Sequence, residues 1–222
     1  MPGGARITME LTPRQLRIGI RSPQALAKAI LRARIASIPP DTPRSAQRRW
    51  MDASIRRYFG DRRKEATLFA DYDDRTGRSK RHESAATEIA HGRHMLERFA
   101  ALDREQPDPT IVQAPRARVE IFGHTLVLDM DLAYRTPHGW NLVSILTDDE
   151  IRRPEHLQLY ATALALHWER RPDGGPVASV ELWLLKGNRG SLTWPRAVLR
   201  RSVKDLHVRL DDIARGAPGQ AA

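Results

Sequence analysis

The stretch from Leu126 to Thr147 constrains the fold of this 222-residue chain more than any other segment. Its sequence, LVLDMDLAYRTPHGWNLVSILT, contains two largely apolar segments separated by Pro137-His138-Gly139. Short apolar runs bounded by proline and glycine are typical of strands joined by a tight turn. We therefore predict strands at 126–134 and 140–146 that pair as a hairpin, so the protein is expected to contain a sheet.

Two carboxylates interrupt the first of these strands. Asp129 and Asp131 are two residues apart, and alternate residues of a regular strand point to the same face of a sheet. Together with Glu120, on the strand predicted just before them, they form a candidate metal site, because Mg²⁺ prefers carboxylate oxygens. The alternative interpretation is the charged, solvated face of an edge strand.

The first half of the chain is predicted to be helical. Thr12-Pro13 and Ser22-Pro23 each place an N-cap residue before a proline at the first helical position. The predicted elements of this half are helices from Pro13, Pro23 and Ser45, an exposed polar loop at 71–81, a helix at 83–102 and a proline-bearing linker at 106–115. We assign residues 1–105 to a basic helical region that belongs to the same domain as the rest.

The second half has the short apolar runs and glycine-containing turns of an α/β fold. Residues 106–216 are predicted to form its core, and 217–222 a flexible tail. The predicted elements are strands at 118–122, 126–134, 140–146 and 177–185, a helix from Pro154, a turn at 187–190 and a last helix from Pro195.

The excess positive charge lies in the first half of the chain. Of the net charge of +10, residues 1–100 contribute 21 Lys/Arg against 11 Asp/Glu, whereas residues 101–222 have 16 of each. Such an asymmetry favours a polyanionic partner, because neutralising phosphates releases counterions; the alternative is a solvated arginine-rich surface. The candidate nucleic-acid-binding side chains are Arg48, Arg49, Arg56, Arg57, Arg62, Arg63 and Lys64.

Composition excludes several classes of site. The chain has no cysteine, which excludes disulfides, cysteine-ligated zinc and iron–sulfur clusters. No apolar run approaches the roughly 20 residues of a membrane-spanning helix, and the first residues lack a signal-peptide core. We therefore expect no membrane association and a cytoplasmic location.

The order of these elements resembles the RecB-like branch of the PD-(D/E)XK nucleases over most of the chain. The resemblance implies a restriction-endonuclease-like α/β fold, with a central mixed sheet flanked by helices and a basic N-terminal helical region. The segments that carry it are Leu11-Thr12-Pro13-Arg14-Gln15-Leu16 and Ser22-Pro23 at the family's helix starts, Val119-Glu120-Ile121-Phe122 and Met130-Asp131-Leu132 at its acid-bearing strands, and His156-Leu157-Gln158-Leu159-Tyr160 at its Q-L-x-x-Y helix.

The resemblance also implies a catalytic site. In the family, two aspartates hold one or two Mg²⁺ or Mn²⁺ ions, and the lysine of a D-x-K motif orients or polarises the attacking water. Asp131 stands at the first aspartate position, with Glu120 on the preceding strand. Ser144, Leu146 and His156 replace the second aspartate, the lysine and the glutamine. Because a serine hydroxyl is a poor divalent ligand and leucine carries no charge, we expect an impaired site.

Two arrangements would restore metal binding. In one, Asp131 acts with Asp129 or Glu120. In the other, acids that follow the second strand of the hairpin bind the ion, and an arginine of the next helix replaces the missing lysine. These residues are Asp148, Asp149 and Glu150 with Arg152 or Arg153. The alternative for them is a polar turn whose acids interact favourably with a helix N-terminus.

Three functions are compatible with the sequence. The first is a DNA-binding or DNA-processing accessory protein that has a nuclease-like fold and an impaired active site. The second is an active divalent-metal-dependent DNA nuclease that uses Asp131 with Asp129 or Glu120. The third is a pseudo-nuclease scaffold that binds a protein partner in a DNA-processing or defence complex.

Overall fold

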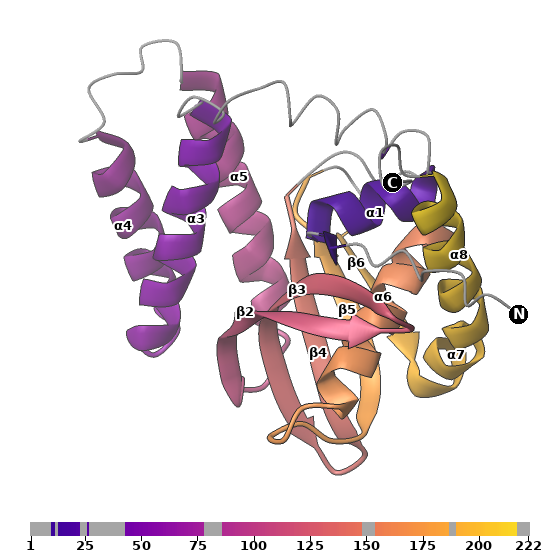
Figure 1. Cartoon of the computed structure of the whole chain (residues 1–222). Helices are drawn as coiled ribbons and strands as arrows, with labels where there is room; N and C mark the ends of the chain where they lie inside the picture. Colours follow the sequence, from indigo (N-terminus) through magenta and orange to yellow (C-terminus); the bar gives the residue numbers. More distant parts are fainter. Residues whose placement is uncertain are drawn as a thin grey trace, which may run out of the picture.

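The protein is a mixed α/β structure with one mixed sheet that has helices on both faces (Figure 1). A computed structural model describes residues 10–11, 13–22, 26, 43–77, 86–147, 154–186 and 190–216. Its strands are β1 (Glu10–Leu11), β2 (Ile111–Ile121), β3 (His124–Thr136), β4 (Gly139–Leu146), β5 (Val177–Leu184) and β6 (Gly190–Pro195). Its helices are α1 (Pro13–Arg21), α3 (Pro43–Gly60), α4 (Glu65–Gly77), α5 (Ala86–Asp103), α6 (Pro154–Glu169), α7 (Arg196–Arg201) and α8 (Val203–Gly216).

The sheet is built around an antiparallel meander followed by a helical crossover. β2, β3 and β4 pair antiparallel in sequence order, α6 then crosses back, and β5 pairs parallel to β4. β6 adds antiparallel to β5, and the short β1 pairs parallel with the start of β3. β3 is therefore the strand that both hairpins share, and it lies next to β1 at one end and β4 at the other.

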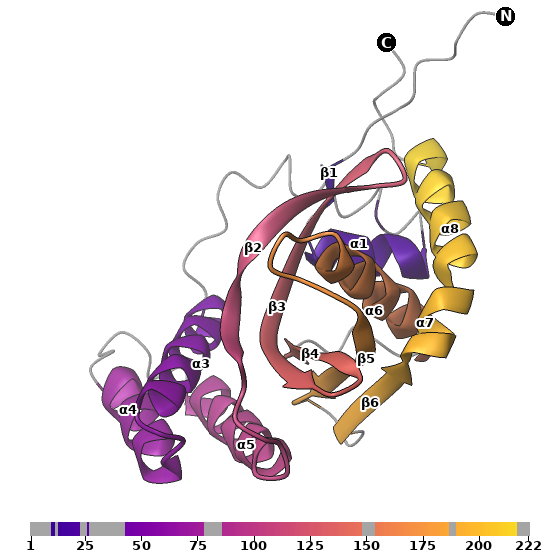
Figure 2. The ribbon, with the colours of Figure 1, turned by 90° about the horizontal axis from the view of Figure 1, so that it is seen from below.

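Each face of the sheet has its own hydrophobic core. Helices α1, α6, α7 and α8 cover one face, where Leu146, Tyr160 and Leu206 are buried; we call this the α6 core. Helices α3 and α5, with α4 packed on them, cover the other face, where Tyr58 and Trp183 are buried; we call this the α3 core. Figure 2 shows the two groups of helices on opposite sides of the long, bent β2–β3 hairpin.

Most of the elements with a long apolar pattern are confirmed. The two strands predicted at 126–134 and 140–146 correspond to β3 and β4 and pair as a hairpin. Helices begin at Pro13 and Pro154, and another, α3, begins at Pro43, close to the predicted start at Ser45. The helix predicted from Pro23 and the tail at 217–222 lie outside the described residues, apart from Leu26.

The predicted loop at 71–81 is wrong for its described part. Residues 71–77 belong to α4, in which Leu68, Tyr72 and Thr76 recur every four residues and are buried. Asp71 is buried as well, but Ser54 and Arg75 satisfy its carboxylate with hydrogen bonds. The buried side chains and the Ser54–Asp71 hydrogen bond are tertiary contacts that stabilise the helix, and a polar sequence does not reveal them.

Three further corrections concern the edges of the sheet. The predicted linker at 106–115 ends early, because β2 begins at Ile111. Residues 190–195 form strand β6, which was not predicted. The last predicted helix is two helices that meet at Ser202, a buried residue whose hydroxyl donates to the Val198 carbonyl. Among the described helices, none is long and apolar enough to cross a bilayer.

Candidate functional site

The candidate site lies where β3 and β4 separate. Their ladder runs from Thr136 and Gly139 to Leu132 and Val143, and one further step in this register places Asp131 opposite Ser144. There the Asp131 Oδ2 atom accepts a hydrogen bond of 2.6 Å from the backbone N–H of Ile145. The carboxylate thus provides the acceptor for a β4 amide where the backbone ladder ends.

The side-chain alternation of β3 changes phase at the same residue. Leu126, Leu128 and Met130 are buried in the α6 core, whereas Leu132 and Tyr134 are buried in the α3 core. A regular strand would keep all five on one face. The expectation that Asp129 and Asp131 share a face assumes that regularity, and the Asp129 side chain lies outside the described residues.

Ser144 and Leu146 are buried positions of β4. The exposed fraction is 1% for Ser144 and 3% for Leu146, and Leu146 belongs to the α6 core. The Leu146 carbonyl accepts a hydrogen bond of 3.0 Å from the N–H of Leu185, which continues the pairing with β5. Leu146 therefore contributes packing, and the buried Ser144 offers a neutral hydroxyl in place of a carboxylate.

The structure does not bring Glu120 to Asp131. Glu120 pairs with Thr125 beside the turn of the β2–β3 hairpin. Asp131 lies six positions after Thr125 along β3, which is about 20 Å at the usual rise per strand residue. Glu120 is exposed, and its carbonyl accepts a hydrogen bond of 2.7 Å from Arg170. Glu120 therefore does not join Asp131 in the expected metal set.

His156 is at the same end of the sheet as Asp131. It lies in the first turn of α6, which starts beyond the carboxyl end of β4 and runs back toward the start of β5. One turn later, Tyr160 is buried in the α6 core, with the Arg17 guanidinium 5.3 Å from its ring centroid. Apart from Glu120, the positions that the resemblance assigns to a site thus lie at one end of β4.

Basic side chains also reach this end of the sheet. Arg48 of α3 donates a hydrogen bond of 3.0 Å to the Thr147 hydroxyl, and Arg98 of α5 donates one of 3.4 Å to the Leu185 carbonyl. Lys186 lies two residues after the end of β5. We did not predict Arg98 as a site residue, because its position beside Leu185 depends on how α5 packs against the sheet.

The donors described at this end do not match the needs of a divalent ion. Within the described residues, no group of three or more His, Asp or Glu side chains is arranged to hold a metal. Asp131 uses one oxygen for Ile145, and Ser144 and Leu146 supply no charge. The alternative residues Asp148, Asp149, Glu150, Arg152 and Arg153 lie outside the described part of the chain.

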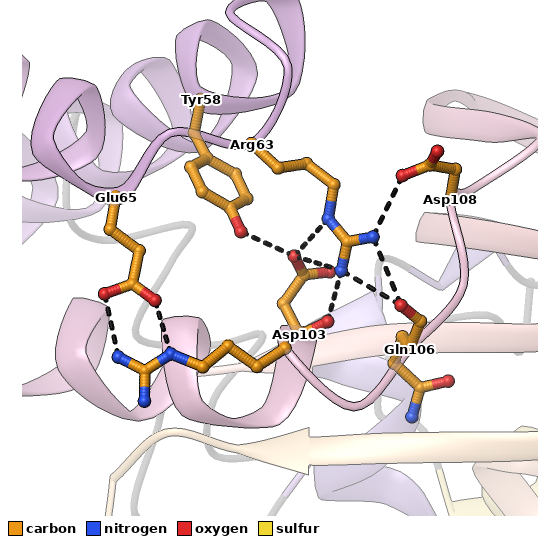
Figure 3. Close-up of polar contacts among 7 residues, drawn as sticks. Tyr58, Arg63, Glu65, Asp103, Gln106 and Asp108 are labelled. Carbon is orange, nitrogen blue, oxygen red and sulfur yellow. Dashed lines mark hydrogen bonds and ion pairs between the residues drawn. The ribbon is translucent and has the colours of Figure 1, made fainter.

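Arg63, one of the predicted nucleic-acid-binding residues, is occupied inside the fold (Figure 3). Its guanidinium donates to Asp103 Oδ2 at 2.8 Å, to Asp108 at 3.0 Å and to the Gln106 carbonyl at 3.1 Å. The Tyr58 hydroxyl donates to the same Asp103 oxygen at 2.7 Å, and burial and this carboxylate raise the pKa of Tyr58 to about 12. Since the Asp103 side chain is fully buried, Arg63 is its structural counterion.

The other six predicted basic residues divide into two groups. Arg48, Arg57 and Lys64 form ion pairs with Asp52, Asp71 and Asp61, respectively, although Arg57 and Lys64 stay about two-thirds exposed. Arg49, Arg56 and Arg62 are exposed. No hydrogen bond or ion pair joins the side chain of Arg56 or Arg62 to another residue of the described ranges.

Most of the excess charge lies away from α3, α4 and α5. Residues 43–77 and 86–100 hold 11 Lys/Arg and 8 Asp/Glu, so these helices are close to neutral. Residues 1–42 hold seven basic and two acidic residues, and 78–85 hold three and one. Of these two segments, the structure describes only 10–11, 13–22 and 26. The basic character of the first half therefore comes mainly from sequence before α3 and between α4 and α5.

Comparison with known proteins adds no assignment. No protein-family model and no curated protein matches this chain.

Proposed function

We propose that the protein is a DNA-binding or DNA-processing accessory protein with a RecB-like PD-(D/E)XK nuclease core and an impaired metal site. The observation that carries the proposal is the position of Asp131, opposite Ser144 at the separation of β3 and β4. The strand order supports the resemblance as well, because an antiparallel meander, a crossover helix and a parallel strand occur in the expected sequence.

The contacts of this end of the sheet favour binding over hydrolysis. A metal template must polarise a phosphate and activate a water, which requires a charged ligand set. Here Ser144 and Leu146 are packed in the interior, and the Asp131 carboxylate accepts from a backbone amide. Nothing in this arrangement supplies a second carboxylate or a lysine at the family positions.

Phosphate binding is favoured by the cations around the same end. Arg48 and Arg98 donate hydrogen bonds to Thr147 and Leu185, the residues just after β4 and β5, and Lys186 follows Leu185. Contacts between cationic side chains and the phosphate backbone of DNA bind the polyanion without reading its base sequence. We therefore expect affinity for DNA with weak sequence preference.

The test measures cleavage and binding with the full chain. Labelled single- and double-stranded DNA is incubated with Mg²⁺ or Mn²⁺, and binding is followed by fluorescence anisotropy from 50 to 300 mM salt. We expect intact DNA and an affinity that falls steeply with salt, because counterions are released on binding. Manganese-dependent cleavage that Asp131→Ala abolishes would instead establish an active nuclease, and salt-insensitive or absent binding would refute the DNA-binding proposal.

A further inference from the structure

The turn that ends α3 contains two consecutive residues in the left-handed region. Arg62 has φ 52° and Arg63 has φ 59°. The N–H of Arg63 donates to the Tyr58 carbonyl at 2.8 Å, which is the closing hydrogen bond of a Schellman-type helix end. Glycine is preferred at such a position, because a Cβ atom disfavours positive φ. Each arginine therefore adopts a conformation that its side chain makes less stable.

The strained conformation of Arg63 is compensated by the hydrogen bonds of its side chain. Its guanidinium reaches Asp103, Asp108 and the Gln106 carbonyl, so it links the end of α3 to the end of α5 and to the segment that leads into β2. This network (Figure 3) also fixes the turn in which Arg62 lies.

Arg62 makes no comparable hydrogen bonds within the described fold. Its side chain is exposed, and no hydrogen bond or ion pair joins it to another described residue. Arg56, on the last two turns of α3, is exposed in the same way. Arg62 is therefore an exposed cation that the anchored turn holds in place and whose guanidinium is available for an external contact.

We propose that Arg62, with Arg56, contacts the phosphate backbone of nucleic acid, and that the anchored Arg63 holds the turn that presents it. This inference rests on the proposed function, since it assigns residues to DNA binding. It also narrows the predicted set of basic residues to these two and places a contact at the end of α3, whereas the cations used in the proposed function lie at the ends of β4 and β5. A guanidinium matches a phosphate group in shape and charge.

The presence of an arginine at position 62 has a competing explanation, which is attraction between its charge and the end of α3. A cation near a helix C-terminus is stabilised by the helix dipole, and Arg62→Gln would remove that attraction together with any phosphate contact. Arg62→Gly also removes the charge but relieves the left-handed strain, so weaker binding by this variant cannot be due to a less stable helix end. Arg200→Gln is the matched control, since Arg200 is an exposed arginine of α7 on the opposite face of the sheet.

The experiment measures binding of a 20-base-pair duplex and thermal unfolding for the full-length variants. Both Arg62 variants should weaken binding about five- to tenfold at 0.1 M salt and lower the slope of log K against log[salt] by about one. Arg62→Gly should raise Tm by about 2–4 °C. Arg200→Gln should bind as the wild type does.

Two outcomes would overturn this inference and leave the proposed function intact. In the first, wild-type protein binds DNA and both Arg62 variants bind equally well, with unchanged salt slopes. In the second, Arg200→Gln weakens binding as much as Arg62→Gln, which would show a dependence on overall charge. Absence of DNA binding by the wild-type protein would overturn both proposals.

Discussion

At the scale of single residues, Asp131 acts through its hydrogen bond with β4. Where β3 and β4 part, the Ile145 N–H has no partner on β3 in the regular ladder, and the carboxylate accepts from it. Ile145 is buried in the α3 core. A buried N–H left without an acceptor costs roughly 1–3 kcal/mol. Asp131 therefore has a role in stability that does not depend on a bound metal.

Replacing Asp131 by alanine should lower the free energy of unfolding by about 1–3 kcal/mol, because the Ile145 N–H loses its acceptor. Asp131→Asn should be milder, since its amide oxygen can still accept. Urea unfolding measures both, with Glu120→Ala as the exposed acidic control. Equal losses for Asp131→Ala and Asp131→Asn would show that the hydrogen bond is not what stabilises this region.

Arg63→Ala should cost about 3–5 kcal/mol, because it leaves the Asp103 carboxylate buried without its counterion. Arg104 is the matched control: it pairs with Glu65 at the surface, and its side chain is 64% exposed. Arg104→Ala should cost much less, because solvent screens an exposed ion pair. Chemical unfolding compares the two variants, and similar losses would contradict the structural role assigned to Arg63.

At the scale of elements, α4 shows what sequence patterns miss. Its polar residues suggest a loop, but Asp71 is buried in the fold, where Ser54 and Arg75 donate hydrogen bonds to its carboxylate. Likewise, Arg63 resembles a surface cation until the turn after α3 brings it to Asp103. In contrast, β3, β4 and α6 were predictable because their apolar patterns are long. The phase change at Asp131 was not, since it depends on which helices cover each half of β3.

The contribution of Asp71 to the stability of α4 should depend on acid. Burial tends to raise the pKa of Asp71, but hydrogen bonds from Arg75 and Ser54 outweigh it, so the pKa is lowered from 3.8. A carboxylate with a lower pKa in the folded state stabilises above its unfolded pKa, and this stability is lost as the pH falls through the folded value.

Wild-type protein should therefore lose stability between pH 5 and pH 2 more steeply than Asp71→Asn, which cannot titrate. Urea unfolding across this pH range provides the comparison. Parallel curves for the two proteins would show that Asp71 does not contribute to the acid sensitivity.

At the scale of the whole molecule, one end of the sheet brings together side chains from both halves of the sequence. The carboxyl ends of β4 and β5 collect Asp131, Ser144, His156 and Lys186 together with arginines from α3 and α5. The sequence could predict the first three as a group, because the resemblance aligns them along consecutive elements. It could not predict the arginines, whose positions depend on how the α3–α5 helices pack on the opposite face.

The phase change of β3 also bears on how the chain folds. Its first half is buried under α6 and its second half under α3 and α5, so this one strand completes both cores. A fragment that starts after residue 105 would leave Leu132, Tyr134, Val143, Ile145 and Trp183 without their cover. An uncovered apolar face of that kind favours aggregation. The two sides of the sheet are thus expected to form and unfold as one cooperative unit.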